Sequence, residues 1–118
     1  MELGRSCVHK SYRGGTALTY LWAGLSKYVE YNRIKILFGV ASFHGTDSSK
    51  IASSLSLLHY KYLAPSDLMV NAKSPNKQRM DLVDVREVDR VEATKQIPSL
   101  IKAYLRIGGF VGKDAYID

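Results

Sequence analysis

The sequence predicts a mixed α/β domain in which a central strand–helix–strand unit forms part of a sheet with helices on its faces. Residues 2–9 alternate in polarity and residues 34–43 are apolar and rich in β-branched side chains, and both patterns are typical of strands. Between them, apolar residues recur at helical spacing over residues 15–31. A helix between two such strands favours a parallel, right-handed crossover.

Length and composition indicate one globular domain over residues 1–118. The 118 residues are 46% hydrophobic and 24% charged, which excludes a disordered or fibrous chain. No run approaches the roughly 18 apolar residues of a membrane span, and the single cysteine, Cys7, excludes an internal disulfide. Both observations favour a cytoplasmic setting. The net charge of +6 favours an acidic partner.

The two predicted strands differ in their expected burial. Alternation over residues 2–9 places Leu3 and Cys7 on one inward face, so we expect Cys7 to be a buried, inert thiol. The nearly continuous apolar character of residues 34–43 predicts a strand covered on both faces.

Two further helices are predicted. The first begins at Asp47 or Ser48 and ends near Leu63. Its inward residues are Ile51, Leu55, Leu58 and Tyr62. The second begins at Pro98 and ends before Gly108, and a strand over residues 110–117 follows it. Residues 66–96 give no clear element, apart from a flexible loop at residues 73–77.

The turn before the first helix has the composition of a phosphate cradle. Arg13, Gly14 and Gly15 lie between a strand and a helix, where glycines admit an anion to the backbone amides and the helix N-terminus favours negative charge. Arg13 can add a charge-assisted hydrogen bond. The alternative is a tight connection with a solvated arginine. The spacing fits neither a dinucleotide fingerprint nor a P-loop.

Three ordered motifs resemble one enzyme family. Residues 2–9 followed by Tyr12-Arg13-Gly14-Gly15 resemble the acyl-donor motif of GNAT acyltransferases, in the form found in ornithine N-acyltransferases and in proteins labelled hemolysins. The resemblance continues through residues 37–43 with Gly45-Thr46-Asp47, and through residues 97–106 with Gly108. It implies that residues 1–118 are the C-terminal part of a GNAT domain whose N-terminal half and closing strand are missing.

The resemblance implies an N-acyltransferase of lipid biosynthesis. A fatty acyl group would pass from an acyl carrier protein thioester, or from acyl-CoA, to the amine of an amino acid such as ornithine. The phosphopantetheine arm would run between residues 3–9 and 36–43, and no separate cofactor is implied. The implied donor-binding residues are Val8, His9, Arg13, Gly14, Gly15, Thr16, Ser42 and Phe43. The lipid product would allow peripheral contact with the inner membrane surface.

Catalysis is assigned through a second resemblance. The element Glu2-x-Gly4-Arg5 is similar to the Glu-x-Ser-Arg strand of acyl-homoserine lactone synthases, which implies catalytic roles for Glu2 and Arg5, with Glu2 as the base near the amine. Base assistance is typically worth about 10²–10⁴ in rate. The alternative is a strand-end carboxylate that pairs with Arg5.

The remaining polar and aromatic residues favour no other enzyme class. The three histidines, His9, His44 and His59, form no metal-ligand pattern with Cys7. A set of four aromatics at helical spacing indicates packing rather than a ligand site. These aromatics are Tyr20, Trp22, Tyr28 and Tyr31.

Two other functions stay open. The first is a non-catalytic remnant that binds acyl carrier protein or lipid. The second is a basic nucleic-acid-binding module, which is disfavoured because no predicted helix carries a basic stripe. No nucleic-acid partner is therefore expected.

Overall fold

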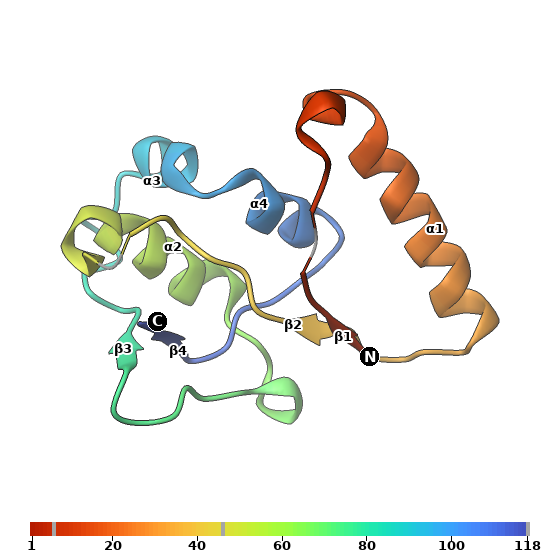
Figure 1. The fold of residues 1–118 in the computed structure, drawn as a ribbon. Coiled ribbons are helices and arrows are strands. Elements are labelled where there is room, and N and C mark those ends of the chain that lie inside the picture. Colours follow the sequence, from red (N-terminus) through yellow and green to blue (C-terminus); the bar gives the residue numbers. More distant parts are fainter. Residues whose placement is uncertain (6, 46, 118) are drawn as a thin grey trace. The chain divides into compact units, whose positions relative to one another are not determined.

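The computed structural model describes residues 1–5, 7–45 and 47–117, and the chain divides into two units, Met1–Val40 and Ala41–Asp118 (Figure 1). Each unit contains helices and one two-stranded sheet, so the predicted mixed α/β class is confirmed. The described strands form one parallel pair and one antiparallel pair instead of a single mixed sheet. None of the described helices is both long and apolar enough to cross a membrane.

The first unit contains the predicted strand–helix–strand arrangement. Strand β1 (Glu2–Leu3) pairs in parallel with β2 (Phe38–Gly39), and helix α1 (Ala17–Tyr31) connects them. Gly39 lies opposite Leu3, and a Cβ at Gly39 would collide with the Leu3 carbonyl oxygen. Glycine at this position therefore allows the two backbones to pair.

Both strands of the first unit are shorter than predicted. Pairing over residues 2–9 stops at Leu3, and Arg5 has a φ of 53°, a left-handed conformation that ends an extended strand. The stretch over residues 34–43 pairs only at β2, and its side chains are largely exposed, Val40 at 89%. The expectation of a strand covered on both faces is wrong here, because the side chains of Ile36, Phe38 and Val40 are more than half exposed.

Helix α1 confirms the periodicity of residues 15–31 but not the packing of all its aromatics. A stripe of half-buried side chains follows the spacing i, i+4, i+7, i+11. These are Leu18, Trp22, Leu25 and Val29. The three tyrosines, Tyr20, Tyr28 and Tyr31, are exposed, so their predicted packing is not observed in the described chain. They lie off this stripe.

The second unit contains the core. Asp47 accepts a hydrogen bond from the Ser49 amide and caps a 3-10 turn, η2 (Ser48–Ile51), which leads into α2 (Ala52–Tyr62). This confirms the second predicted helix. Its buried side chains pack with residues from α3, α4 and the segment between them. The buried core cluster is Leu55, Leu57, Leu58, Met80, Ala93, Ile97 and Ile101.

Two serines on α2 are fully buried and satisfied by hydrogen bonds. The Ser54 hydroxyl donates to the Ala93 carbonyl at 2.7 Å. The Ser56 hydroxyl donates to Met80 O at 3.1 Å and accepts from the amides of Leu82 and Val83 at 3.0 and 2.9 Å. A buried hydroxyl needs such partners. Ser56 therefore fixes the turn after β3 against α2.

Residues 66–96, which gave no clear pattern, contain three elements. These are η3 (Ser66–Leu68), β3 (Lys77–Arg79) and α3 (Arg90–Gln96). Asp89 caps α3 by accepting from the amides of Val91 and Glu92. The predicted loop at residues 73–77 contains a cis Ser74–Pro75 bond and leads directly into β3.

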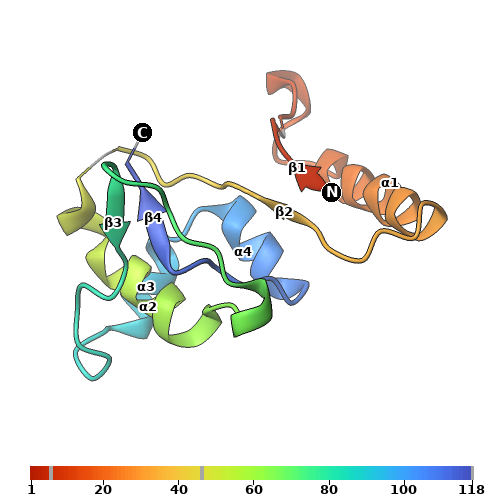
Figure 2. The same ribbon diagram turned by 90° about the horizontal axis from the view of Figure 1, so that it is seen from below.

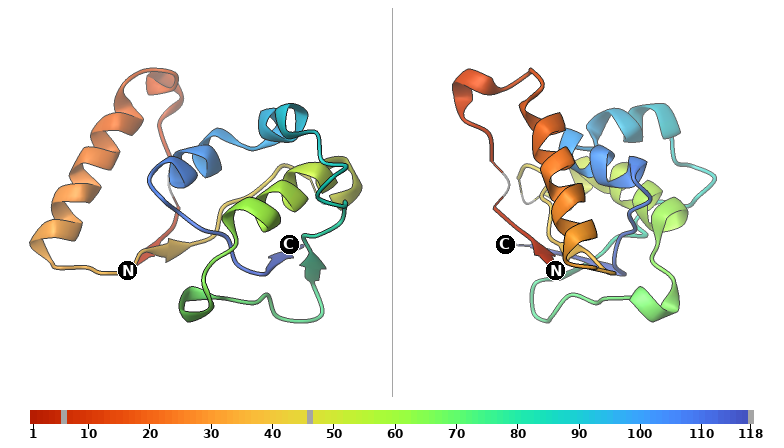
Figure 3. Two further views of the ribbon diagram at one scale, coloured as in Figure 1. Left: turned by 180° about the vertical axis from the view of Figure 1, so that it is seen from behind. Right: turned by 90° about the vertical axis from the view of Figure 1, so that its right-hand side faces the viewer.

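The last predicted helix and strand are both present. Helix α4 (Ser99–Arg106) follows Pro98, and Gly108, with a φ of 89°, ends it. Strand β4 (Asp114–Tyr116) pairs antiparallel with β3, side by side in Figure 2. Within this unit, α2 lies between α3 and the β3–β4 pair (Figures 1 and 3).

Candidate functional site

The segment between β1 and α1 is a closed turn. A 3-10 turn, η1 (Lys10–Tyr12), is capped by His9, whose Nδ1 accepts a hydrogen bond from the Ser11 amide at 3.2 Å. The Tyr12 amide donates to the His9 carbonyl at 2.8 Å, and the two rings meet edge to face at 6.0 Å. The backbone and the side chain of His9 therefore both stabilise the turn that precedes Arg13.

Arg13, which follows the 3-10 turn, bonds back to the residues that precede it. Its Nε donates to the Val8 carbonyl at 2.9 Å, which brings two predicted donor-binding residues together. The Arg13 side chain is exposed, and its terminal nitrogens make no hydrogen bond or ion pair with the described residues. Part of the guanidinium is therefore already oriented, while the rest can reach an anion.

Gly14, Gly15 and Thr16 lead directly into α1. Gly14 has a φ of 80°, which a residue with a Cβ adopts only with strain. Thr16 makes no side-chain cap, and the first turn of α1 contains no acidic residue. No described side chain therefore caps or neutralises the positive end of this helix. Such an arrangement suits a phosphate.

Glu2 and Arg5 lie at the start of the same unit. Glu2 is exposed in β1 opposite Phe38, and Arg5 follows in the left-handed conformation. The ion pairs of the described residues include neither side chain, so the alternative of a Glu2–Arg5 pair is not observed. An unpaired carboxylate has the acceptor capacity that a base requires.

Ser42 and Phe43 belong to the second unit. Ser42 is exposed, and Phe43 is half-buried against the core cluster of that unit. Neither lies in an assigned strand. Ser6 and Thr46, which belong to the family-like motifs, lie outside the described residues.

Cys7 is exposed, so its predicted burial is wrong. The reason is that the strand ends at Leu3 and no inward face extends to residue 7. Among the described residues, no three His, Cys, Asp or Glu side chains gather where a metal ion could bind.

Sequence comparisons match this segment and extend beyond it. A family model described as an acetyltransferase (GNAT) domain matches residues 1–23, from β1 into α1. The whole chain is 52% identical to an L-ornithine N(alpha)-acyltransferase of Rhodobacter capsulatus, covering 45% of that protein. It is 39% identical to the enzyme of the same name from Brucella abortus and 37% identical to that from Agrobacterium fabrum, covering 42% and 40% of them.

The chain is similar to the GNAT domain over residues 1–23 and to the ornithine acyltransferases along its whole length. It spans less than half the length of the curated relatives that it matches. No solved structure matches it. The GNAT match coincides with β1, the His9–Arg13 turn and the start of α1, which are the elements that position most of the predicted donor-binding residues.

One basic cluster was missed by the sequence prediction. Lys102 and Arg106 lie four residues apart on α4, and they line one pocket with Lys61 of α2 and Arg90 of α3. The expectation that no helix carries a basic stripe therefore needs correction for α4. The four-residue spacing on α4 was a usable signal, whereas the other two cations join the cluster only through the tertiary packing of the second unit.

Proposed function

We propose that this chain is part of an N-acyltransferase. The enzyme would transfer a fatty acyl group from an acyl carrier protein thioester to the α-amine of ornithine, as in lyso-ornithine lipid synthesis. The supporting observation is that the GNAT-matched segment contains β1, which pairs in parallel with β2, together with the Arg13–Val8 hydrogen bond and a helix N-terminus without a side-chain cap. The similar proteins are named as L-ornithine N(alpha)-acyltransferases, which supports ornithine as the acceptor. An acyl-CoA donor would use the same phosphate contacts.

The proposed reaction is a direct transfer. The amine nitrogen attacks the thioester carbonyl carbon, the C–N bond forms, the C–S bond breaks, and the sulfur leaves as a thiolate that takes up the amine proton from Glu2. Glu2 accepts the proton that the amine loses, Arg5 is a second catalytic residue, and backbone amides stabilise the oxyanion. Val8, His9, Ser42 and Phe43 contact the donor arm.

The donor phosphate is proposed to lie at Arg13, Gly14, Gly15 and Thr16. Acyl carrier protein is an acidic partner, which agrees with the net charge of +6. We also propose a cytoplasmic setting with peripheral membrane contact through the lipid product.

A donor titration tests the binding step. Amide shifts of the labelled 118-residue chain would be followed by NMR as an acyl carrier protein carrying a long acyl chain is added. We expect localised shifts at Val8, Arg13, Gly14 and Gly15 that weaken with salt. Arg13→Ala should weaken binding about tenfold, because it removes a charge-assisted contact. Lys27→Ala, which removes one charge from the exposed side of α1, is the matched control. Equal losses in the two variants would contradict a phosphate site at Arg13.

An assay of product formation from the acyl donor and ornithine distinguishes a catalytic chain from a non-catalytic chain that only binds the donor. If the chain is active, Glu2→Gln should lower turnover by about 10²-fold or more while donor binding persists. Donor binding without any product would favour the non-catalytic alternative. Shifts with duplex nucleic acid but not with the donor would favour the basic-module alternative.

A further inference from the structure

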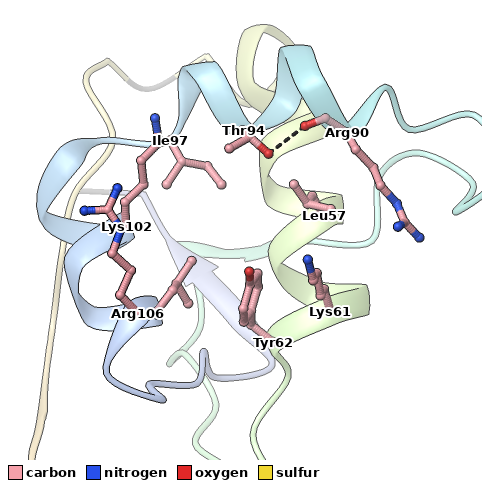
Figure 4. Close-up of a pocket in the computed structure, with 9 residues that line it drawn as sticks. Leu57, Lys61, Tyr62, Arg90, Thr94, Ile97, Lys102 and Arg106 are labelled. Carbon is pink, nitrogen blue, oxygen red and sulfur yellow. Dashed lines mark hydrogen bonds between the residues drawn. The ribbon is translucent and has the colours of Figure 1, made fainter.

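A hollow of about 240 Å³ lies among α2, α3 and α4 in the second unit (Figure 4). Its floor is apolar, and four cationic side chains surround it. The apolar residues are Leu57, Tyr62, Ile97 and Leu105, and the cations are Lys61, Arg90, Lys102 and Arg106. No acidic side chain is among the described residues that line it.

The cations flank the hollow from two sides. Lys102 and Arg106 extend along the α4 side, while Lys61 and Arg90 lie on the opposite side, with Leu57 and Tyr62 between the two pairs (Figure 4). Thr94, on the α3 wall, donates its hydroxyl to the Arg90 carbonyl at 2.6 Å. The arrangement places positive charge at the rim and hydrocarbon at the base.

This charge is not balanced within the described chain. Its described ion pairs are Lys77–Asp114, Arg79–Asp81, Arg86–Asp84 and Lys95–Glu92, none of which includes a lining cation. Lys61 Nζ lies over a neutral group, the Tyr62 ring, at 5.5 Å from its centroid. Lys61, Arg90 and Arg106 are exposed and Lys102 is half-buried, and an anion bound in the hollow would be attracted by these charges.

The shape of the surface indicates how large an occupant can be. A second hollow of about 170 Å³ shares Leu57, Lys61 and Arg90 with the first and continues along Tyr60, Val85 and Val88. The apolar floor therefore extends beyond the cations. Each hollow is below the roughly 300–1,000 Å³ of a usual ligand pocket, and a helix about 10 Å wide would not fit inside either.

We propose that this surface binds an anionic amphiphile, with a phosphate or carboxylate headgroup among the four cations and the start of a hydrocarbon chain on the Leu57–Val85 floor. A headgroup with a narrow chain fits two small adjacent hollows that share three lining residues, whereas an acidic helix does not. The site shares no residue with the proposed donor site, so each proposal can fail while the other stands.

Three small probes measure the contributions of the headgroup and the hydrocarbon chain to binding. The 118-residue chain would be titrated with octyl phosphate, inorganic phosphate and octanol, and the amides of Thr94, Ile97 and Leu105 would be followed by NMR. We expect saturable shifts with octyl phosphate, and binding about tenfold or more weaker for either part alone. Equal affinity for inorganic phosphate would overturn the proposal in favour of a simple anion site.

Matched variants test the assignment of the headgroup. Lys102→Ala/Arg106→Ala should weaken octyl phosphate about tenfold, because two charge-assisted contacts are lost. Lys73→Ala/Lys113→Ala removes the same charge from residues that line neither hollow and should leave the affinity unchanged. Arg90→Gln, at the exposed first residue of α3, is a second test with little risk to folding. Equal losses in the pocket and control variants would overturn the assignment.

Two other results would also overturn it. Octyl phosphate shifts confined to Arg13, Gly14 and Gly15 would place the amphiphile at the donor turn. An acidic helical peptide that shifts Thr94, Ile97 and Leu105 and is not displaced by octyl phosphate would make this face a protein-docking surface.

Discussion

Both units of the chain contain amphipathic helices, yet the buried side chains of the described residues lie only in Ala41–Asp118. In Met1–Val40 the stripe on α1 is half-buried, whereas in the second unit α2, α3 and α4 share a core. The GNAT match lies in the first unit, where none of the described residues is buried. Most of the residues proposed for chemistry therefore lie apart in the sequence from those that form the core, and Phe43, which packs against the core cluster, is an exception.

The largest effect should come from the core. Leu58, on α2, is 2% exposed, so Leu58→Ala should lower the free energy of unfolding by about 2–5 kcal/mol through lost burial and the cavity left behind. The matched change Leu21→Ala, on α1 at 51% exposure, should cost within about 0.5 kcal/mol. Urea titration of both variants measures the difference. Similar losses would show that the first unit contributes equally to stability.

A smaller, local effect is expected at the parallel strand pair. Gly39→Ala places a methyl group against the Leu3 carbonyl, so β1 and β2 should separate at a cost of about 1–3 kcal/mol. The Phe38 amide, bonded to the Met1 carbonyl at 3.1 Å, should then exchange with solvent about tenfold faster. Gly24→Ala, in open space on α1, is the control and should favour the helix by about 0.5–1 kcal/mol. Unchanged exchange at Phe38 would contradict the steric explanation.

The smallest effect should be the pH dependence of one exposed ion pair in the second unit. A two-point hydrogen bond from Arg79, at 3.1 and 3.0 Å, holds the pKa of Asp81 below its usual range. The carboxylate therefore favours folding above its unfolded pKa of about 3.9, and this contribution disappears as the pH falls through the lower folded value. In Asp81→Asn, the free energy of unfolding should therefore fall slightly less steeply as the pH is lowered. An unchanged slope would show that the pair adds nothing.

Local signals predicted the helices well. Asp47, Pro98 and Gly108 occupy the caps where the sequence places them, because capping depends on neighbours in the chain. Helix α3 also had such a signal, Asp89 with Glu92 three residues later, which the mixed charges of residues 81–90 obscured.

The lengths of the strands and the burial of polar side chains could not be predicted from such local signals. An apolar stretch such as residues 34–43 pairs only where another strand is present, and β3 is a polar strand recognisable only by its pairing with β4. The burial of Ser54 and Ser56 depends on carbonyls 39 and 24 residues away. For the candidate site, the sequence motif predicted that Val8, Arg13 and Gly14 belong together. It could not predict the hydrogen bond between Arg13 and Val8.

The exposed thiol of Cys7 has a practical consequence for spectroscopy. Because the sequence contains one cysteine, a maleimide fluorophore or nitroxide would label each chain at a single position. That position is adjacent to Val8, the residue whose carbonyl anchors Arg13. A reporter there would sense changes in the turn without any engineered substitution.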